Sequence, residues 1–130
     1  MGHGDYQADR GGMLLLENED RSPHLVSAAT FAAWLKDEPL RLVFLNACET
    51  GTTPDDASAH PFAGVAAALI QSNAPAVVAM QFPISDSAAI EFARTFYTRV
   101  ADGFLVDAAV AEGRKALFDD AATEWATPVL

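Results

Sequence analysis

Residues 42–48 read LVFLNAC, a run of four apolar residues followed by a polar residue, a small residue and a cysteine. A continuous apolar run of this length is typical of a strand that is covered on both faces of a parallel sheet. A second run, AVVAM, follows at residues 76–80, and apolar residues at helical spacing lie between the two runs at residues 62–70. A strand, a helix and a second strand in this order predict a parallel pair joined by a right-handed crossover. We therefore expect an α/β fold in which residues 42–47 form the central strand.

The flanking sequence continues this alternation of strands and helices. Ser27 is the predicted N-cap of a helix at residues 28–36. A later helix is predicted to begin at Ser85 or Asp86 and to end at Gly103. The expected strands are residues 13–17, 42–47, 76–80 and 128–130, and the expected helices are residues 28–36, 62–70, 86–102 and 105–118. No repeat, low-complexity tract or linker divides the sequence, so residues 1–130 are expected to form a single domain.

The composition argues against several classes of protein. With 51% apolar residues, 130 residues can build a core, which excludes a disordered chain. A formal net charge of -10 repels a phosphate backbone and argues against nucleic-acid binding. No apolar run reaches the ~20 residues of a membrane span. Because Cys48 is the single cysteine and no signal-peptide pattern follows Met1, we expect a cytoplasmic protein without internal disulfides.

Cys48 is the strongest candidate for chemistry. Ligands of open α/β sheets bind beyond the carboxyl ends of the strands, where Cys48 and the glycine-bearing loop after it are expected to lie. A thiol needs a nearby base to become a nucleophile, and His3, between two glycines, is the candidate base. A buried, unreactive cysteine remains the alternative, although the polar neighbours Asn46 and Glu49 argue against it.

Other sites find little support. His24 and His60 lie in polar, proline-flanked stretches and are expected to be solvated loop residues. The three histidines and Cys48 lack the close spacing of zinc ligands, so no metal site is expected. Pro54 occupies the position at which a cysteine phosphatase needs arginine, and no dinucleotide-binding glycine pattern is present. We expect no organic cofactor.

Six short motifs along the chain together resemble those of the CHAT domains, which are caspase-like cysteine peptidases that often accompany tetratricopeptide repeats. The resemblance rests on GHG at residues 2–4, LVFLNACETG at 42–51, FAG at 62–64, APAVVA at 74–79, FPISD at 82–86 and WATPVL at 125–130, in the order of the family's motifs. The interval between His3 and Cys48 is also similar to the caspase-type spacing of about 50 residues. The likeness covers nearly the whole chain.

The resemblance implies a caspase-like three-layer α/β/α fold with a mostly parallel central sheet. It further implies that Cys48 is the nucleophile, that His3 is the acid and base, and that the backbone N–H groups of Gly4 and Cys48 form the oxyanion hole. The implied substrate is a protein or peptide. Asp86 lies at the position of the family's selectivity residue, where a carboxylate would favour substrates with Arg or Lys immediately before the cleaved bond. Glu49 is implied to contact the substrate as well. The alternative for Asp86 is a helix cap.

In the family, further strands precede the catalytic histidine, and here only two residues do. We therefore expect a C-terminal portion of the domain that lacks those strands and leaves one edge of residues 42–47 or 13–17 unpaired. Such domains are usually gated by a tetratricopeptide-repeat or other regulatory region. The sequence thus predicts an endopeptidase, with two alternatives: a catalytically silent interaction module of the same fold, and a small-molecule hydrolase.

Overall fold

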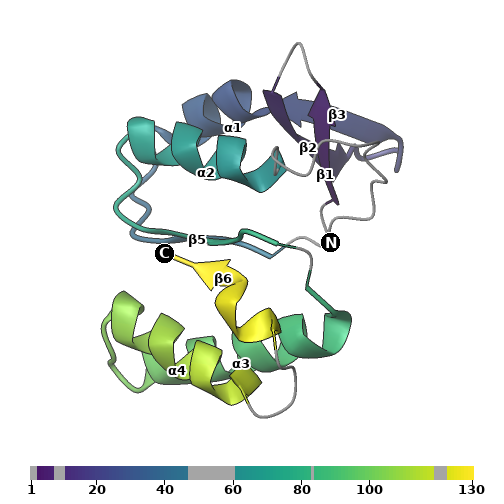
Figure 1. Cartoon of the computed structure of the whole chain (residues 1–130). Coiled ribbons are helices and arrows are strands. Elements are labelled where there is room, and N and C mark those ends of the chain that lie inside the picture. Colours follow the sequence, from purple (N-terminus) through teal and green to yellow (C-terminus); the bar gives the residue numbers. More distant parts are fainter. Residues whose placement is uncertain (1–2, 8–10, 47–60, 83, 119–122) are drawn as a thin grey trace. The chain divides into compact units, whose positions relative to one another are not determined.

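The computed structural model describes residues 3–7, 11–46, 61–82, 84–118 and 123–130. They form four α-helices, one 3-10 helix and two small sheets. The chain divides into two units, Met1–Ala79 and Met80–Leu130; Figure 1 colours the chain from purple at its N-terminus to yellow at its C-terminus. In the part of the chain that the structure describes, none of the helices combines the length and the apolar character that a membrane span requires.

The first unit begins with a three-stranded antiparallel sheet of order β1-β2-β3. Its strands are β1 (His3–Gln7), β2 (Gly11–Glu17) and β3 (Pro23–Ser27). The sequence predicts the middle strand alone, since neither neighbour has a clear pattern of apolar residues. Because β2 is paired with a strand on each side, the unpaired edge expected at residues 42–47 or 13–17 does not lie at residues 13–17.

A tight turn between β2 and β3 explains the third strand. Asn18 donates its N–H to the Ser22 carbonyl over 3.0 Å, and Arg21 adopts a left-handed conformation with φ 65°. The Asp20 carboxylate accepts from both the hydroxyl (2.6 Å) and the N–H (2.9 Å) of Ser22, and these hydrogen bonds lower the pKa of Asp20. The turn places His24 within β3, opposite Leu16, so the loop assignment of His24 is wrong although the side chain is exposed.

Helices α1 (Ala28–Leu35) and α2 (Pro61–Gln71) pack against each other and against β2. The predicted cap of α1 is confirmed, because the Ser27 hydroxyl accepts from the Thr30 N–H over 3.1 Å. After α2, Asn73 has a φ of 69° and Ala74 returns its N–H to the Leu69 carbonyl over 3.0 Å. This left-handed residue ends the helix, as glycine or asparagine commonly does.

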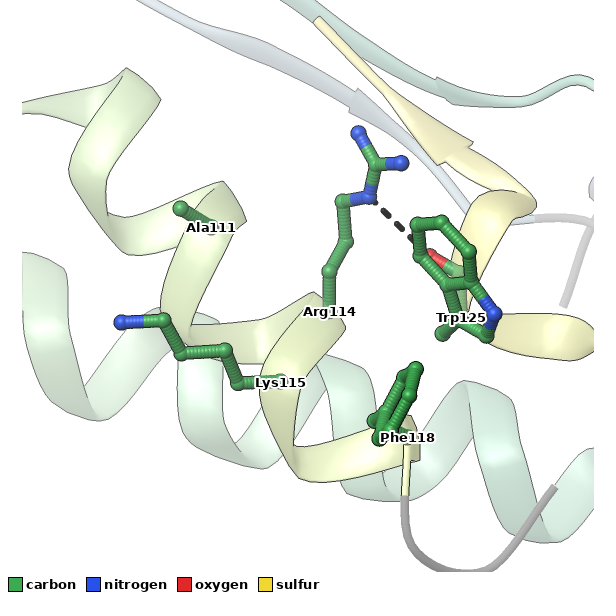
Figure 2. Close-up of a pocket in the computed structure, with 5 residues that line it drawn as sticks. All are labelled: Ala111, Arg114, Lys115, Phe118 and Trp125. Carbon is green, nitrogen blue, oxygen red and sulfur yellow. Dashed lines mark hydrogen bonds between the residues drawn. The ribbon is translucent and has the colours of Figure 1, made fainter. Parts of the chain in front are cut away.

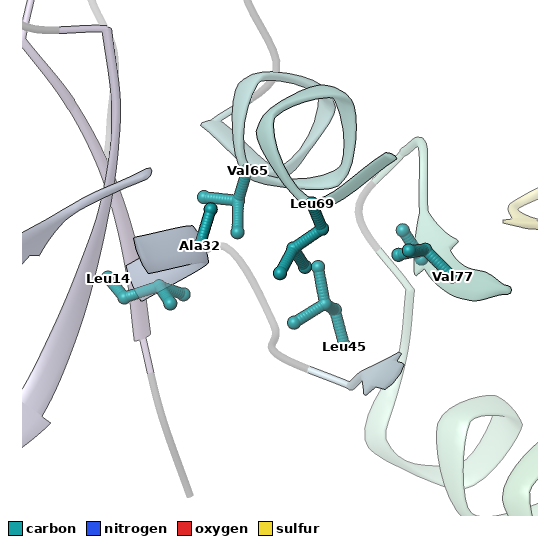
Figure 3. Close-up of a cluster of buried hydrophobic side chains, with 7 residues drawn as sticks. Leu14, Ala32, Leu45, Val65, Leu69 and Val77 are labelled. Carbon is teal, nitrogen blue, oxygen red and sulfur yellow. The ribbon is translucent and has the colours of Figure 1, made fainter. Parts of the chain in front are cut away.

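The predicted parallel pair is confirmed. Strand β4 (Val43–Leu45) runs parallel to β5 (Val77–Met80), with Phe44 opposite Val78. All four residues of β5 are buried, whereas in β4 only Leu45 is. In the strand order of this sheet β4 is an outer strand beside β5, so the expectation that residues 42–47 form the central strand is wrong. Among the described strands, the unpaired edge expected at residues 42–47 is found. Side chains from the sheet β1-β2-β3, both helices and this pair meet in one core, drawn in Figure 3. Its buried members are Leu14, Ala32, Leu45, Val65, Leu69, Val77 and Ala79.

The second unit contains α3 (Asp86–Ala101), α4 (Val106–Phe118), the 3-10 helix η1 (Glu124–Ala126) and β6 (Pro128–Val129). Its core holds two fully buried rings, Phe92 and Phe96, stacked with centroids 5.9 Å apart. Gly103, with φ 86°, ends α3 as predicted. The α/β class is thus confirmed, and the three-layer arrangement and the single domain stay predictions.

Candidate functional site

His3 and Gly4 lie on the outer strand of the three-stranded sheet. The register places His3 opposite Leu15 and Gly4 opposite Leu14, a side chain of the core. The backbone of both residues is therefore held by antiparallel pairing to a strand that the core itself fixes. The imidazole of His3 lies outside the described side chains, so its role as acid and base stays a prediction.

A close backbone contact joins strand β2, which pairs with β1, to helix α2. A Cβ atom added at Gly64 would lie 3.3 Å from the Gly12 nitrogen and 3.5 Å from its Cα atom. In the pairing of β1 with β2, Gly12 lies opposite Tyr6. The two glycines thus let the start of α2 approach the strand pair that carries His3. The sequence shows both glycines but not that they meet.

Cys48 and Glu49 lie outside the described residues. The described chain reaches Asn46, which is exposed and directly follows β4. Because β4 and β5 are parallel, their carboxyl ends lie at the same edge of the sheet. Cys48 therefore remains, by its position in the sequence, a residue expected just beyond that edge.

Asp86 is the first residue of α3, and its side chain is exposed. The residue that caps the helix is Ser85, whose hydroxyl accepts from the Ala88 N–H over 3.3 Å. Of the two caps that the sequence left open, Ser85 is thus the one found. A carboxylate in the first turn is favourable beside the helix dipole. Asp86 is therefore a first-turn residue rather than the N-cap, and its role in substrate selection stays a prediction.

The start of α3, helix α4 and residues 124–127 are joined by hydrogen bonds of three side chains that the sequence did not point to. The Glu124 carboxylate accepts from the N–H of Ser85 (2.7 Å) and from its hydroxyl (2.9 Å). The Gln81 side chain donates to the Ala126 carbonyl over 2.7 Å, and the Gln81 N–H donates to the Thr127 carbonyl over 2.9 Å. The third residue, Arg114, donates from Nε to the Trp125 carbonyl over 3.0 Å. Since these partners are far apart in the sequence, no local pattern could have paired them.

A cavity of about 390 Å³ opens between α4 and η1 and is shown in Figure 2. Its lining residues are Ala111, Arg114, Lys115, Phe118 and Trp125. The Arg114 guanidinium lies 5.2 Å from the centre of the Trp125 ring, and Phe118 meets the same ring edge-on at 5.9 Å. Lys115 is engaged by Glu112, with 2.6 Å between Nζ and Oε1. Chemically, the cavity could hold an apolar group that carries a negative charge.

Among the described residues, no cluster of three or more His, Cys, Asp or Glu side chains could hold a metal ion. The model of the CHAT domain family matches residues 1–129 of the chain. Neither the comparison with curated proteins nor the comparison with solved structures gave a match. The matched range includes all of the predicted site residues, which are His3, Gly4, Cys48, Glu49 and Asp86.

Proposed function

The chain belongs to the CHAT domain family, and we propose from this premise that it is the catalytic part of a caspase-like cysteine endopeptidase. Cys48 is the nucleophile and His3 the acid and base. The observation that carries the proposal is the family match over residues 1–129, because it covers both members of the dyad in one continuous range. No metal or organic cofactor takes part in the proposed reaction.

The proposed reaction has two steps. The imidazole of His3 accepts the proton of the Cys48 thiol, the sulfur attacks the scissile carbonyl carbon, and the C–N bond breaks as the imidazole delivers that proton to the leaving amine. Water then adds to the thioester, which releases the new carboxylate and returns the thiol. In each step the negative charge on the carbonyl oxygen is met by the backbone N–H groups of Gly4 and Cys48. Pairing of Gly4 with the core strand β2 supports this role, because a pre-oriented donor needs a rigid backbone.

Asp86 is proposed as the residue that selects the substrate, with Glu49 as a second acidic contact. An ionised carboxylate favours an Arg or Lys side chain through a charge-assisted hydrogen bond. The exposed position of Asp86 supports this role, as does its place a few residues after β5. In the whole protein, we expect a tetratricopeptide-repeat or other regulatory region to control the site.

The test is intact-mass labelling of the folded protein with peptide electrophiles that carry Arg, Asp or Leu at the reactive end. We expect labelling at Cys48 alone, fastest for the Arg reagent, and its loss in Cys48→Ala and in His3→Ala. Asp86→Ala should remove the preference for Arg and retain labelling by the Leu reagent. Circular dichroism of each variant verifies that it is folded.

Three results would contradict the proposal. A folded wild-type protein that no reagent labels is not a peptidase by itself and fits the catalytically silent interaction module. Labelling at the same rate in His3→Ala would show an ordinary exposed thiol rather than an activated one. Turnover of simple esters with no preference for peptides would instead indicate the small-molecule hydrolase.

A further inference from the structure

The N-terminus of α3 is completed by a residue from a distant part of the chain. In the common capping box, Glu or Gln three residues after the cap accepts the N–H of the cap residue. Here that position is Ala88, which has no acceptor in its side chain. The Glu124 carboxylate accepts the Ser85 N–H instead, over 2.7 Å, and also the Ser85 hydroxyl hydrogen, over 2.9 Å. Because the hydroxyl donates to Glu124, its oxygen stays available to the Ala88 N–H.

The segment that carries Glu124 is itself held on its far side. Arg114 of α4 donates to the carbonyl of Trp125, the residue after Glu124, and its guanidinium lies beside the indole ring (Figure 2). The next carbonyl, that of Ala126, accepts from the Gln81 side chain over 2.7 Å. The segment that carries Glu124 is thus hydrogen-bonded both to α4 and to residues that precede α3.

We propose that Glu124 is a positioning residue for substrate selection: by capping Ser85 it holds Asp86, the next residue, in the orientation that recognises a basic side chain. This inference rests on the proposed function, in which Asp86 provides the selectivity. A charge-assisted hydrogen bond requires its carboxylate to be held in a narrow range of positions, so loosening the first turn of α3 weakens recognition. Glu124 itself touches no substrate.

The test compares the rates at which Cys48 is labelled by the Arg and the Leu peptide electrophiles in the full chain. Glu124→Ala is expected to lower the Arg-over-Leu preference about tenfold and to leave labelling by the Leu reagent unchanged. Glu124→Gln keeps the preference, because its amide oxygen can accept the Ser85 N–H and its amide nitrogen can donate to the Ser85 hydroxyl. Glu91→Ala is the matched control: it removes a carboxylate of α3 that, within the described part of the chain, forms an ion pair with Arg94 and with no other charged residue.

A second measurement does not depend on labelling. Hydrogen exchange of the amides at residues 85–88 should be faster in Glu124→Ala than in wild type, and unchanged in Glu91→Ala. If Glu124→Ala proves too unstable to handle, Glu124→Asp replaces it, since the shorter side chain keeps the charge but cannot reach both donors of Ser85. It too should show faster exchange and a reduced preference.

The possible failures are distinguishable. If Asp86→Asn leaves the Arg-over-Leu preference unchanged, the selectivity assigned to Asp86 in the proposed function is wrong, and this inference falls with it. If Asp86→Asn removes the preference whereas Glu124→Ala retains it, only the positioning role of Glu124 is overturned. Equal amide exchange in Glu124→Ala and wild type overturns that role even if no form of the protein is labelled.

Discussion

Gly113 shows how a single residue takes its importance from the fold. A Cβ atom at this position of α4 would lie 2.7 Å from two ring carbons of Phe92, which is fully buried on α3. Glycine within a helix costs about 1 kcal/mol relative to alanine, so the sequence alone would identify Gly113 as a weak point. The structure reverses that conclusion, because the two helices approach so closely that a methyl group does not fit.

At the residue scale we therefore predict that Gly113→Ala destabilises the protein, by about 1–3 kcal/mol in the free energy of unfolding, as overpacked cores do. Urea denaturation followed by circular dichroism measures the change. Ala111→Gly, at an exposed position of the same helix, is the control and should cost about 1 kcal/mol through helix propensity alone. A Gly113→Ala protein more stable than wild type would show that the two helices do not approach as closely as described.

Glu112 joins two elements at once. On its own helix its carboxylate meets Lys115, with 2.6 Å between Oε1 and Nζ, and its other oxygen lies 3.9 Å from Nε of Arg99 on α3. The hydrogen bond from Lys115, its charge and that of Arg99 together lower the pKa of Glu112 from the usual 4.5. The pair within α4 could be predicted from its spacing of three residues. The contribution of Arg99 could not, because it depends on how the two helices pack.

At the element scale this lowered pKa predicts a dependence of stability on pH. A carboxyl whose pKa is lower in the folded state stabilises that state above its unfolded pKa, and the effect is lost as pH falls through the folded pKa. We expect the wild type to melt at a slightly higher temperature than Glu112→Gln at pH about 6, and the difference to vanish near pH 3. Melting temperatures of both proteins across this range test the prediction. A difference that does not change with pH would contradict it.

The whole molecule carries a formal net charge of -10, which is a property of the sequence and independent of the fold. A field of this sign raises the local concentration of cationic ligands and repels anionic ones. The selectivity proposed for Asp86 acts in the same direction, but over the distance of one hydrogen bond. The two effects can be separated by salt, because screening acts mainly on charges farther apart than about 10 Å at 0.1 M ionic strength.

At the scale of the molecule we predict that added salt slows labelling of Cys48 by an Arg reagent with further basic residues beyond its reactive end. Labelling by the Arg reagent with a neutral remainder should change much less between about 0.02 and 0.2 M sodium chloride. When the Arg and the Leu reagents are otherwise neutral, the ratio of their labelling rates should be the same at both salt concentrations. Equal salt dependence of the basic and the neutral reagents would rule out steering by the net charge.

By itself the sequence determined the helices, the cap of α1, the parallel pair of strands and the membership of the CHAT family. These features depend on apolar spacing, on cap residues and on short motifs, all of which are written in consecutive residues. Strands β1 and β3 escaped prediction because their pairing with β2, rather than their own composition, makes them strands. Only the tertiary structure decided that Glu124 completes the cap of α3, because this contact joins residues 39 positions apart. Hydrogen bonds between residues far apart in the sequence depend on how whole helices and strands pack, so no pattern of neighbouring residues predicts them.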